Sequence, residues 1–256
     1  MNPTNLNRRD FCALAGGTFA SVMFSSSCSG VVENNGRLDA RPNRNLPALK
    51  PGRTTFGFDG HQDAILEVPK TAAQSGIPLF VMLHGATQSA DDMFGYLNSA
   101  HEEAGIAVLA PNSRDTTWDA IGSSFGFGPD IEFLNRALER TFEIAPIDPA
   151  CVSVGGFSDG ASYAVSLGLI NGDFFKNVVG FSPGFVIQRA PVGRPRFYIS
   201  HGTHDHILPI DRCGRQIATW LKTRGYDVAF REFEGDHEIP ADVMREGLAR
   251  VTASAG

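Results

Sequence analysis

The chain has 256 residues, of which 42% are hydrophobic and 20% charged, a composition typical of a globular protein with enough length to bury one sizeable core. Its formal net charge of −6, with no long run of like charges, argues against a nucleic-acid partner, because phosphate binding requires clustered lysine and arginine. The body of the chain has no uncharged apolar stretch of about 18 residues or more, so the sequence predicts no transmembrane segment.

The first 30 residues have the pattern of an export signal. Arg8 and Arg9 are followed by an acidic and an aromatic residue, and then by a short apolar run at 12–24. This run is too short to span a bilayer, and its basic start is typical of a signal peptide. Adjacent arginines ahead of such a run are similar to the twin-arginine signal of bacteria. We predict that residues 1–30 are a signal peptide of this type and that the protein is exported to the periplasm or the extracellular space.

The cysteines raise the questions of a lipid anchor and of a disulfide. Cys28 lies at the end of the predicted signal peptide, which leaves open a lipoprotein acylated at Cys28, although Ser25 stands where such motifs usually have an aliphatic residue. Cys151 and Cys213 are expected near opposite ends of the sheet, and a strand of about six residues spans about 20 Å. Because a Cα separation above about 7 Å cannot be bridged, we predict no disulfide.

Strand and helix patterns alternate along most of the chain. Residues 31–53 are rich in Asn, Arg and Pro without an apolar period, which predicts a linker or lead-in. The predicted strands cover Thr54–Asp59, Ala64–Val68, Pro78–Leu83, Ile106–Ala110, Cys151–Phe157, Asn177–Phe181, Arg196–Ser200 and Asp227–Phe233. The predicted helices cover 89–104, Asp130–Phe142, Ala161–Ile170, Ile210–Thr223 and Pro240–Val251.

This alternation predicts one α/β domain over residues 54–256. Continuous apolar strands separated by helices indicate a mostly parallel sheet with helices on both faces. The first two strands are joined by the turn at Asp59-Gly60, which predicts an antiparallel opening hairpin at one edge. In such sheets ligands bind outside the carboxyl ends of the strands, so the residues that come directly after each strand are the candidates for chemistry.

Residues 156–160 read Gly-Phe-Ser-Asp-Gly and match the G-x-S-x-G pattern at a predicted strand-to-helix turn. A sharp turn of this kind presents the Ser158 hydroxyl above the sheet, and the flanking glycines remove side chains that would clash. The backbone N–H of Asp159 points from the helix N-terminus toward the oxyanion that develops during attack on a carbonyl. We predict that Ser158 is the nucleophile.

A second match to the same pattern occurs at 180–184, which reads Gly-Phe-Ser-Pro-Gly. Pro183 and Gly184 open no helix, and the chain continues with an apolar segment toward Pro191. Ser182 therefore fits the letters of the motif but lacks its structural context, and we do not assign it as a nucleophile.

The order of an α/β-hydrolase triad is Ser, acid, His. Asp205 lies in the loop after the strand Arg196–Ser200, and His237 lies after the last predicted strand. His206 is the chain neighbour of Asp205 and is poorly placed to bridge it to Ser158. We predict a triad of Ser158, Asp205 and His237.

Two other acids lie near this site in the sequence. Asp211 is expected at the start of a helix, where a carboxylate is stabilised by the helix dipole. Asp236 directly precedes His237, and neighbouring side chains in an extended loop diverge. The histidines 201, 204 and 206 lie in one short loop and cannot easily converge on a metal ion, so we predict no metal site.

The loop after the strand Pro78–Leu83 is the candidate for the second oxyanion donor. Gly85 allows close approach of the backbone, and we choose the N–H of Ala86 as the donor. Three aromatic residues near the same edge are candidates for an apolar wall of the substrate pocket; they are Trp118, Phe125 and Phe127.

The chain resembles the phospholipase/carboxylesterase and polyhydroxybutyrate-depolymerase-like group of bacterial α/β-hydrolases. The matching segments are LHGAT at 83–87, SRDTTWD at 113–119, GFSDGASYA at 156–164, FSPGF at 181–185, HGTHDHILPIDRC at 201–213 and FEGDH at 233–237. By this resemblance Ser158, Asp205 and His237 form the triad, and Ala86 and Asp159 donate to the oxyanion. It further implies a monomeric or dimeric esterase with no cofactor. The chain lacks an obvious extra substrate-binding domain, which argues against degradation of a polymer.

The sequence thus predicts a serine hydrolase that cleaves small-molecule carboxylic esters through an acyl-enzyme intermediate, without a metal or another cofactor. A thioesterase or an acyltransferase would use the same triad with a different leaving group or acceptor. A non-catalytic exported lipoprotein that only binds a ligand would have no need of all three residues. The sequence does not select the acyl group or the alcohol.

Overall fold

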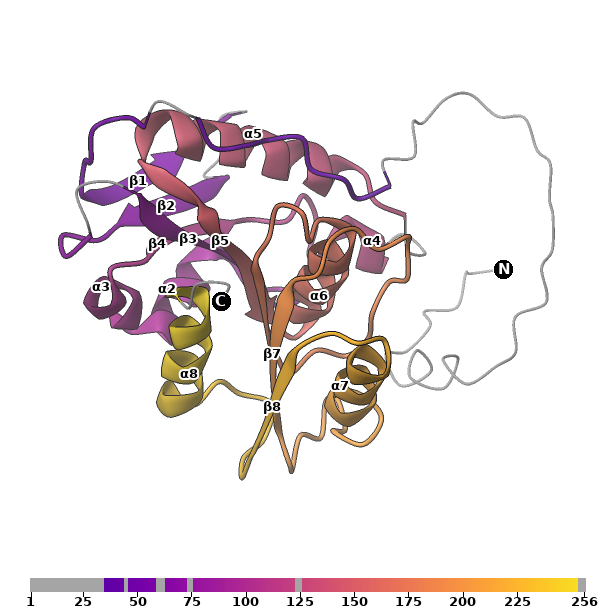
Figure 1. Ribbon diagram of the computed structural model, residues 1–256. Helices are drawn as coiled ribbons and strands as arrows, with labels where there is room; N and C mark the ends of the chain where they lie inside the picture. Colours follow the sequence, from indigo (N-terminus) through magenta and orange to yellow (C-terminus); the bar gives the residue numbers. More distant parts are fainter. Residues whose placement is uncertain (1–34, 44–45, 59–62, 73–75, 123–125, 253–256) are drawn as a thin grey trace, which may run out of the picture.

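An eight-stranded sheet forms the centre of the described part of the chain, with the strand order β1-β2-β4-β3-β5-β6-β7-β8 (Figure 1). The computed structural model describes residues 35–43, 46–58, 63–72, 76–122 and 126–252. The predicted signal peptide with Arg8, Arg9 and Cys28, and the pocket candidate Phe125, lie outside the described residues.

The strands of this sheet are mostly parallel. They are β1 (Gly52–Phe56), β2 (Ala64–Val68), β3 (Ile77–Leu83), β4 (Ala107–Pro111), β5 (Ile147–Phe157), β6 (Asn177–Phe181), β7 (Arg196–Gly202) and β8 (Val228–Phe233). The strand β2 runs antiparallel to both of its neighbours, β1 and β4, and each pair from β4 through β3 to β8 is parallel. The predicted opening hairpin at one edge of a mostly parallel sheet is confirmed.

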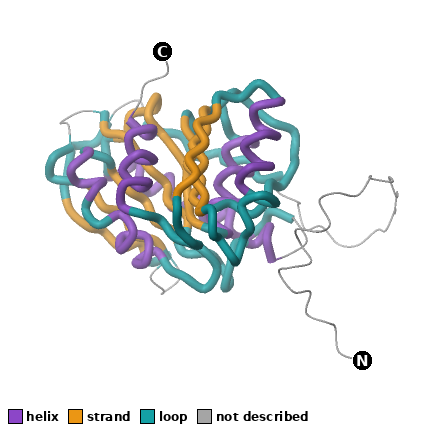
Figure 2. The backbone as a smooth tube through the Cα atoms, turned by 90° about the horizontal axis from the view of Figure 1, so that it is seen from below, coloured by secondary structure: helices purple, strands orange, loops and turns teal. Residues whose placement is uncertain are grey.

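Helices cover both faces of the sheet (Figure 2). On one face lie α2 (Ala90–Leu97), α3 (Ala100–Ala104) and α8 (Ala241–Thr252), and on the other lie α4 (Asp119–Gly122), α5 (Pro129–Ile144), α6 (Asp159–Ile170) and α7 (Gly214–Thr223). This arrangement confirms the predicted α/β class. None of the helices in the described ranges has the length and hydropathy needed to cross a bilayer.

The strand β3 shows why the central strands lack polar alternation. Leu79 and Val81 pack into the core on one face, and Phe80 and Met82 pack into the core on the other. Since successive side chains of a strand point to opposite faces, a strand covered on both faces must be apolar at every position. The continuous apolar run in the sequence is the direct consequence.

The helix predicted over 89–104 is in fact two helices. Ser89 and Asp92 form a capping box at its start. Asn98 and Ser99 then adopt left-handed conformations, with φ of 41° and 65°, which end α2 and turn the chain into α3. Asparagine tolerates this conformation better than most residues, but nothing in the local composition distinguishes it from an asparagine within a helix.

Two further helices also differ from the prediction. The helix expected from Ile210 begins at Gly214, because residues 210–213 form a tight turn in which the N–H of Cys213 is donated to the carbonyl oxygen of Pro209. The short helix α4 had no predicted counterpart.

Cys151 and Cys213 are thiols and do not form a disulfide with each other.

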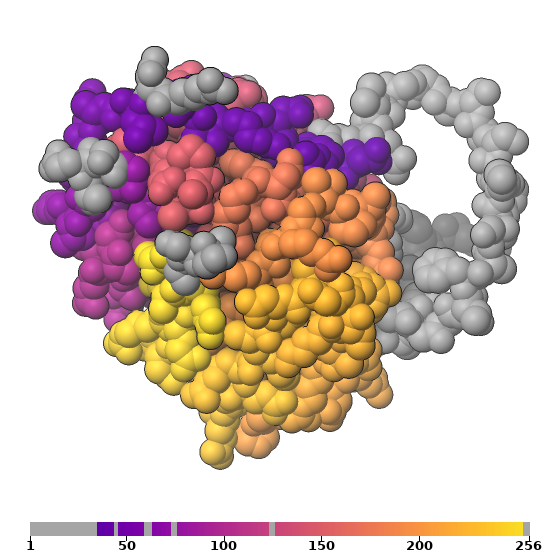
Figure 3. Space-filling view, viewed as in Figure 1, coloured from indigo at the N-terminus to yellow at the C-terminus, as the bar shows by residue number. Residues whose placement is uncertain are grey.

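The described part of the predicted linker packs on the domain. We call residues 35–43 the N-terminal strap; it runs beside α5 in Figure 1 and forms part of the indigo surface in Figure 3. Leu38 is only 1% exposed, and its N–H is donated to the Asn171 side chain at 2.9 Å. Arg37 makes a bidentate contact to Asp173, with distances of 2.8 and 2.9 Å. The strap is too short to show an apolar period, so its sequence alone predicts a linker.

We expect Leu38→Ala to lower the free energy of unfolding by about 2–4 kcal/mol, because it removes a completely buried leucine side chain. Urea unfolding of both proteins measures the difference. Leu46, which is 41% exposed, is the matched control, and Leu46→Ala should change stability by less than about 0.5 kcal/mol. Equal stability of the two variants would mean that the strap does not pack on the domain in solution.

Candidate active site

The structure brings Ser158, Asp205 and His237 together at the carboxyl ends of neighbouring strands. Ser158 lies between β5 and α6, Asp205 lies after β7, and His237 lies after β8. These strands are parallel and lie within one half of the sheet, so the residues after their carboxyl ends lie close together at the same end of the strands.

The sharp turn at Ser158 depends on glycine at both sides. Ser158 has φ of 56° and ψ of −117°, a conformation that costs an L-residue about 1–3 kcal/mol. A Cβ atom at Gly156 would lie 2.5 Å from the carbonyl oxygen of Leu83, and one at Gly160 would lie 2.3 Å from the same atom. The turn therefore packs directly against the end of β3, and the Ser158 N–H is donated to the carbonyl oxygen of Phe181 at 3.0 Å.

The three side chains form a continuous hydrogen-bond chain. The Ser158 Oγ lies 2.9 Å from His237 Nε2, and His237 Nδ1 lies 2.7 Å from Asp205 Oδ2. Since an ionised carboxylate can only accept, His237 carries its proton on Nδ1, and Nε2 is left to accept the proton of the Ser158 hydroxyl. The ring of Phe157 packs beside the His237 imidazole, with 4.7 Å between the centroids.

The Asp205 carboxylate is buried but fully hydrogen-bonded. Its Oδ1 accepts the N–H groups of Ile207 at 3.0 Å and Leu208 at 2.7 Å. Its Oδ2 lies near the imidazoles of His237 and His201. Burial alone would raise the pKa of Asp205, but the hydrogen bonds from His201, His237 and the Leu208 N–H outweigh it and hold this pKa well below its ordinary value.

The two other candidate acids have different partners. Asp236 accepts the backbone N–H of His237 at 2.8 Å and pairs with the exposed His206 at 2.6 Å between Oδ1 and Nδ1. Asp211 pairs with Arg215 at 2.6 Å on the surface. Of these three carboxylates, only Asp205 contacts the His237 ring.

The oxyanion candidates lie beside the nucleophile. A Cβ atom at Gly85 would lie 3.3 Å from the Ser158 Cβ, so the loop after β3 touches the turn. The Gly85 N–H is donated to Gln88 Oε1 at 3.0 Å, whereas the Ala86 N–H has no acceptor among the described residues. Asp159 is the first residue of α6, directly after the nucleophile, so its backbone N–H lies at the positive end of the helix dipole. An oxyanion bound here could receive hydrogen bonds from Ala86 and Asp159.

Sequence reasoning missed Gln88, which holds the loop after β3 in place. Its Oε1 accepts the Gly85 N–H, and its Nε2 donates to the Tyr96 hydroxyl at 3.0 Å. Gln88 thereby occupies the Gly85 N–H and leaves that of Ala86 available. The sequence carried one indication of this role, namely that Gln88 is a polar residue in the loop between a buried strand and the start of a helix.

His84 supports the same loop from within the core. Its Nδ1 lies 2.7 Å from the Gly85 carbonyl oxygen, and its Nε2 accepts the N–H of Ser113 at 2.9 Å. Burial lowers the pKa of His84, which favours this neutral form. These two contacts give His84 a structural role in the loop after β3.

The comparisons with known proteins concern mainly the architecture. No family model matches the sequence. The chain is 28% identical over 149 residues to NocK of Nocardia uniformis subsp. tsuyamanensis, which is named as a candidate esterase. The matched region covers 55% of this chain and 43% of NocK, so the chain spans less than half the length of this relative.

Two solved structures share the fold over most of this chain. One is the fluorophosphonate-binding serine hydrolase F of Staphylococcus aureus, with a TM-score of 0.63 and 14% identity over 80% of this chain and 100% of that chain. The other is a phospholipase/carboxylesterase of Dyadobacter fermentans DSM 18053, with a TM-score of 0.56 and 18% identity over 81% of this chain and 100% of that chain. The chain has the α/β-hydrolase fold.

In this α/β-hydrolase fold, Trp118 and Phe127, two of the three aromatic residues expected on the pocket wall, are buried in the core. Trp118 is 0% exposed, stacks on Tyr163 with 5.2 Å between the ring centroids, and donates its indole N–H to the His84 carbonyl oxygen at 2.8 Å. Phe127 is also buried and packs against Tyr163. Because the indole N–H finds a backbone acceptor inside the protein, Trp118 can be buried completely, and this hydrogen bond ties it to the start of the loop after β3.

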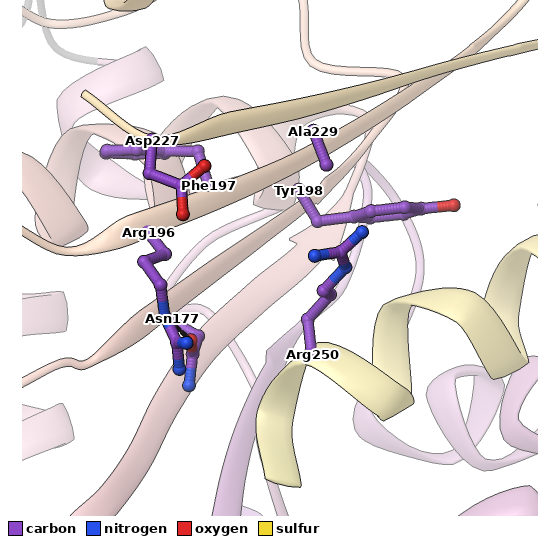
Figure 4. Close-up of a pocket in the computed structure, with 7 residues that line it drawn as sticks. All are labelled: Asn177, Arg196, Phe197, Tyr198, Asp227, Ala229 and Arg250. Atoms are coloured by element: carbon purple, nitrogen blue, oxygen red, sulfur yellow. Dashed lines mark hydrogen bonds between the residues drawn. The ribbon is translucent and has the colours of Figure 1, made fainter. Parts of the chain in front are cut away.

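A small pocket lies at the amino-terminal end of the strands, on the side of the α/β-hydrolase sheet opposite the triad (Figure 4). Its volume is about 40 Å³, and it lies where β6, β7 and β8 begin, away from the carboxyl ends that carry the triad; it is lined by Asn177, Arg196, Phe197, Tyr198, Asp227, Ala229 and Arg250. This pocket is not part of the candidate active site. Among the described residues, no group of three or more His, Cys, Asp or Glu side chains is arranged to hold a metal ion.

We expect Gly85→Ala to lower kcat/KM by about 10²- to 10³-fold, the size usual for loss of an oxyanion donor. A Cβ atom there would lie 2.7 Å from Gln88 Oε1 and 3.3 Å from the Ser158 Cβ, so it would displace Gln88 from the Gly85 N–H and press against the turn at Ser158. The matched control is Gly95→Ala in α2, where a Cβ atom meets nothing within 4 Å. Gly95→Ala should keep its activity and gain up to about 1 kcal/mol of stability. Wild-type activity in Gly85→Ala would remove this loop from the oxyanion site.

Proposed function

We propose that this protein is a serine hydrolase that cleaves carboxylic esters through a covalent acyl-enzyme intermediate. The observation that supports the proposal is the chain of hydrogen bonds from Ser158 Oγ through both nitrogens of His237 to Asp205, at 2.9 and 2.7 Å. Both distances lie in the range that proton transfer from a nucleophile to a base requires.

The proposed reaction has two halves. Ser158 Oγ attacks the ester carbonyl carbon while His237 Nε2 takes its proton, and Asp205 stabilises the imidazolium that forms. The carbonyl oxygen, now an anion, accepts hydrogen bonds from the N–H groups of Ala86 and Asp159. His237 then returns the proton to the departing alkoxide, which leaves as an alcohol. Water, deprotonated by His237, attacks the acyl carbon; the bond from this carbon to Ser158 Oγ then breaks, His237 returns the proton to Oγ, and the carboxylic acid is released.

The comparisons support the reaction class and leave the substrate open. NocK is named as a candidate esterase, and the two solved structures are named as a serine hydrolase and a phospholipase/carboxylesterase. A small-molecule ester is the substrate class that we propose on this basis, with no cofactor taking part.

Covalent labelling and then a substrate panel test this function. A fluorophosphonate should form one adduct, on the peptide that contains Ser158, and His237→Ala should slow its formation. A protein that only binds its ligand would not be labelled. A panel of p-nitrophenyl esters of increasing chain length, with aryl esters and acyl thioesters beside them, then measures kcat/KM for each class. Faster turnover of thioesters than of every ester would replace the esterase by a thioesterase.

We also propose that the protein is exported through the twin-arginine route. The support is the sequence around Arg8 and Arg9. Changing both residues to lysine should trap the precursor in the cytoplasm, as fractionation and immunoblotting would measure. Palmitate labelling, and its loss in Cys28→Ser, tests whether the exported protein is lipid-anchored. Delivery of the Lys-Lys variant at the wild-type level would contradict the twin-arginine assignment.

A further inference from the structure

A buried histidine lies behind the candidate acid, on the side away from His237. His201 is the next-to-last residue of β7 and is completely buried. Its Nε2 lies 2.7 Å from the carbonyl oxygen of Leu208 and 3.2 Å from Asp205 Oδ2. The same Asp205 oxygen meets His237 Nδ1 at 2.7 Å, so two imidazoles share one carboxylate oxygen.

The surroundings of His201 fix where its proton lies. The carbonyl oxygen of Leu208 and the carboxylate of Asp205 can only accept, so Nε2 carries its single hydrogen, which it donates to the Leu208 oxygen at 2.7 Å and shares with Asp205 Oδ2 at 3.2 Å. The other nitrogen, Nδ1, is buried and has no partner in the described part of the chain. A second proton there would leave an unpaired N–H in the interior, which is costly. His201 is therefore a neutral donor.

The start of α7 packs directly behind the His201 ring, so the ring has no space to move away from Asp205. Gly214, the first residue of α7, lies against it, and a Cβ atom at Gly214 would be 2.6 Å from His201 Nδ1 and 2.9 Å from its Cβ. The ring is thus confined between α7 and the Asp205 carboxylate. This packing also accounts for a glycine as the first residue of α7, because any larger residue would displace the ring.

The donors around Asp205 form a complete set. The N–H groups of Ile207 and Leu208 bind Oδ1, and the two imidazoles bind Oδ2. The bond from His201 to the Leu208 carbonyl oxygen also ties the loop that carries Asp205 to the end of β7. If His201 were absent, Oδ2 would keep only His237, and the carboxylate could rotate away from it.

We infer that His201 is a positioning residue for the catalytic acid: its Nε2–H holds the Asp205 carboxylate in the orientation in which Oδ2 meets His237, without contacting the substrate. The inference rests on the proposed function, because it assigns His201 a part in that reaction. It differs from a packing role in one measurable respect, namely that the donor at Nε2 matters and not only the volume of the ring.

Three replacements of His201 separate the donor from the volume. Glutamine can place its side-chain N–H groups where Nε2 lies, with one for Leu208 and one for Asp205. Leucine fills much of the space without a donor, and asparagine has the amide but not the reach. We expect His201→Leu and His201→Asn to lower kcat by about 10- to 100-fold with KM nearly unchanged, the range found for groups that orient the side chains of metal sites. His201→Gln should keep kcat within about threefold of wild type.

A second variant moves the ring without removing it. Gly214→Ala places a methyl group against His201 Nδ1 and should press the imidazole out of position, lowering kcat while every triad residue is present. Gly95→Ala, which meets open space, is its control. Gly214→Ala keeps the inference testable if His201→Leu fails to fold.

The positioning role of His201 is tested by p-nitrophenyl ester kinetics together with proton NMR of the full chain. The proton between His237 and Asp205 should give a low-field resonance in the wild type and in His201→Gln, and this resonance should shift or broaden in His201→Leu and His201→Asn. Equal kcat and an unchanged resonance in all variants would overturn the inference, as would an equal loss in the glutamine and leucine variants. A wild type that shows the resonance but hydrolyses no ester would refute the proposed function and leave the positioning contact standing.

Discussion

Replacing Ser158 with alanine is expected to reduce ester hydrolysis to near background, by roughly five to six orders of magnitude. The variant loses the atom that forms the covalent intermediate, and His237 Nε2, which lies 2.9 Å from that atom, loses its proton donor. Alanine can occupy the turn at φ of 56° at about the same cost as serine, so the fold should be kept. Initial rates with a p-nitrophenyl ester, beside a melting curve for each protein, measure both properties.

Ser182 is the matched control for this prediction. It stands in the same five-residue pattern at the end of the neighbouring strand β6, and its φ of 52° is close to that of Ser158. It is completely buried, however, and its Oγ has no partner among the described residues. Ser182→Ala removes an unsatisfied hydroxyl and should leave activity and stability near wild type. An inactive Ser182→Ala together with an active Ser158→Ala would reverse the assignment.

The comparison of the two serines shows what the sequence could predict. Both have the motif and a left-handed backbone, so neither the letters nor the local conformation separates them. The difference lies in the next residues along the chain, because Ser158 opens α6, whereas Ser182 is succeeded by Pro183 and an irregular segment. A run of small and apolar residues over Ala161–Ile170 that predicts a buried helix is visible in the sequence, and this longer-range context selects Ser158.

The features that the sequence failed to predict depend on contacts between distant segments. Trp118 looked like a pocket residue because it comes after a strand, but its indole N–H is donated to His84, 34 positions away along the chain. Leu38 lay in a segment without a period, and its burial depends on Asn171, 133 positions away. The fold class was predictable because it arises from local patterns repeated many times. The burial of Trp118 and Leu38 was not, because it depends on contacts with segments far away along the chain.

The second large effect is expected for the acid. In Asp205→Asn, the side-chain oxygen must stay at the Oδ1 position to accept the Ile207 and Leu208 N–H groups, so the NH₂ group takes the place of Oδ2. This NH₂ group then faces His237 Nδ1 as a donor. Nδ1 must become an acceptor, the proton moves to Nε2, and the imidazole can no longer take the Ser158 proton. We expect kcat to fall by roughly 10³- to 10⁴-fold, the effect known for an orienting aspartate in a serine triad.

Asp236→Asn is the control that makes this result specific to Asp205. Asp236 is the chain neighbour of His237 and accepts its backbone N–H at 2.8 Å, which an asparagine oxygen can still do. The change weakens only the surface pair with His206, whose side chain is 69% exposed. Asp236→Asn should therefore keep kcat within a few-fold of wild type, with a small change in melting temperature. If Asp236→Asn were the inactive variant and Asp205→Asn turned over at the wild-type rate, His237 would take its orientation from Asp236, and the hydrogen-bond chain from Ser158 to Asp205 would not be the catalytic one.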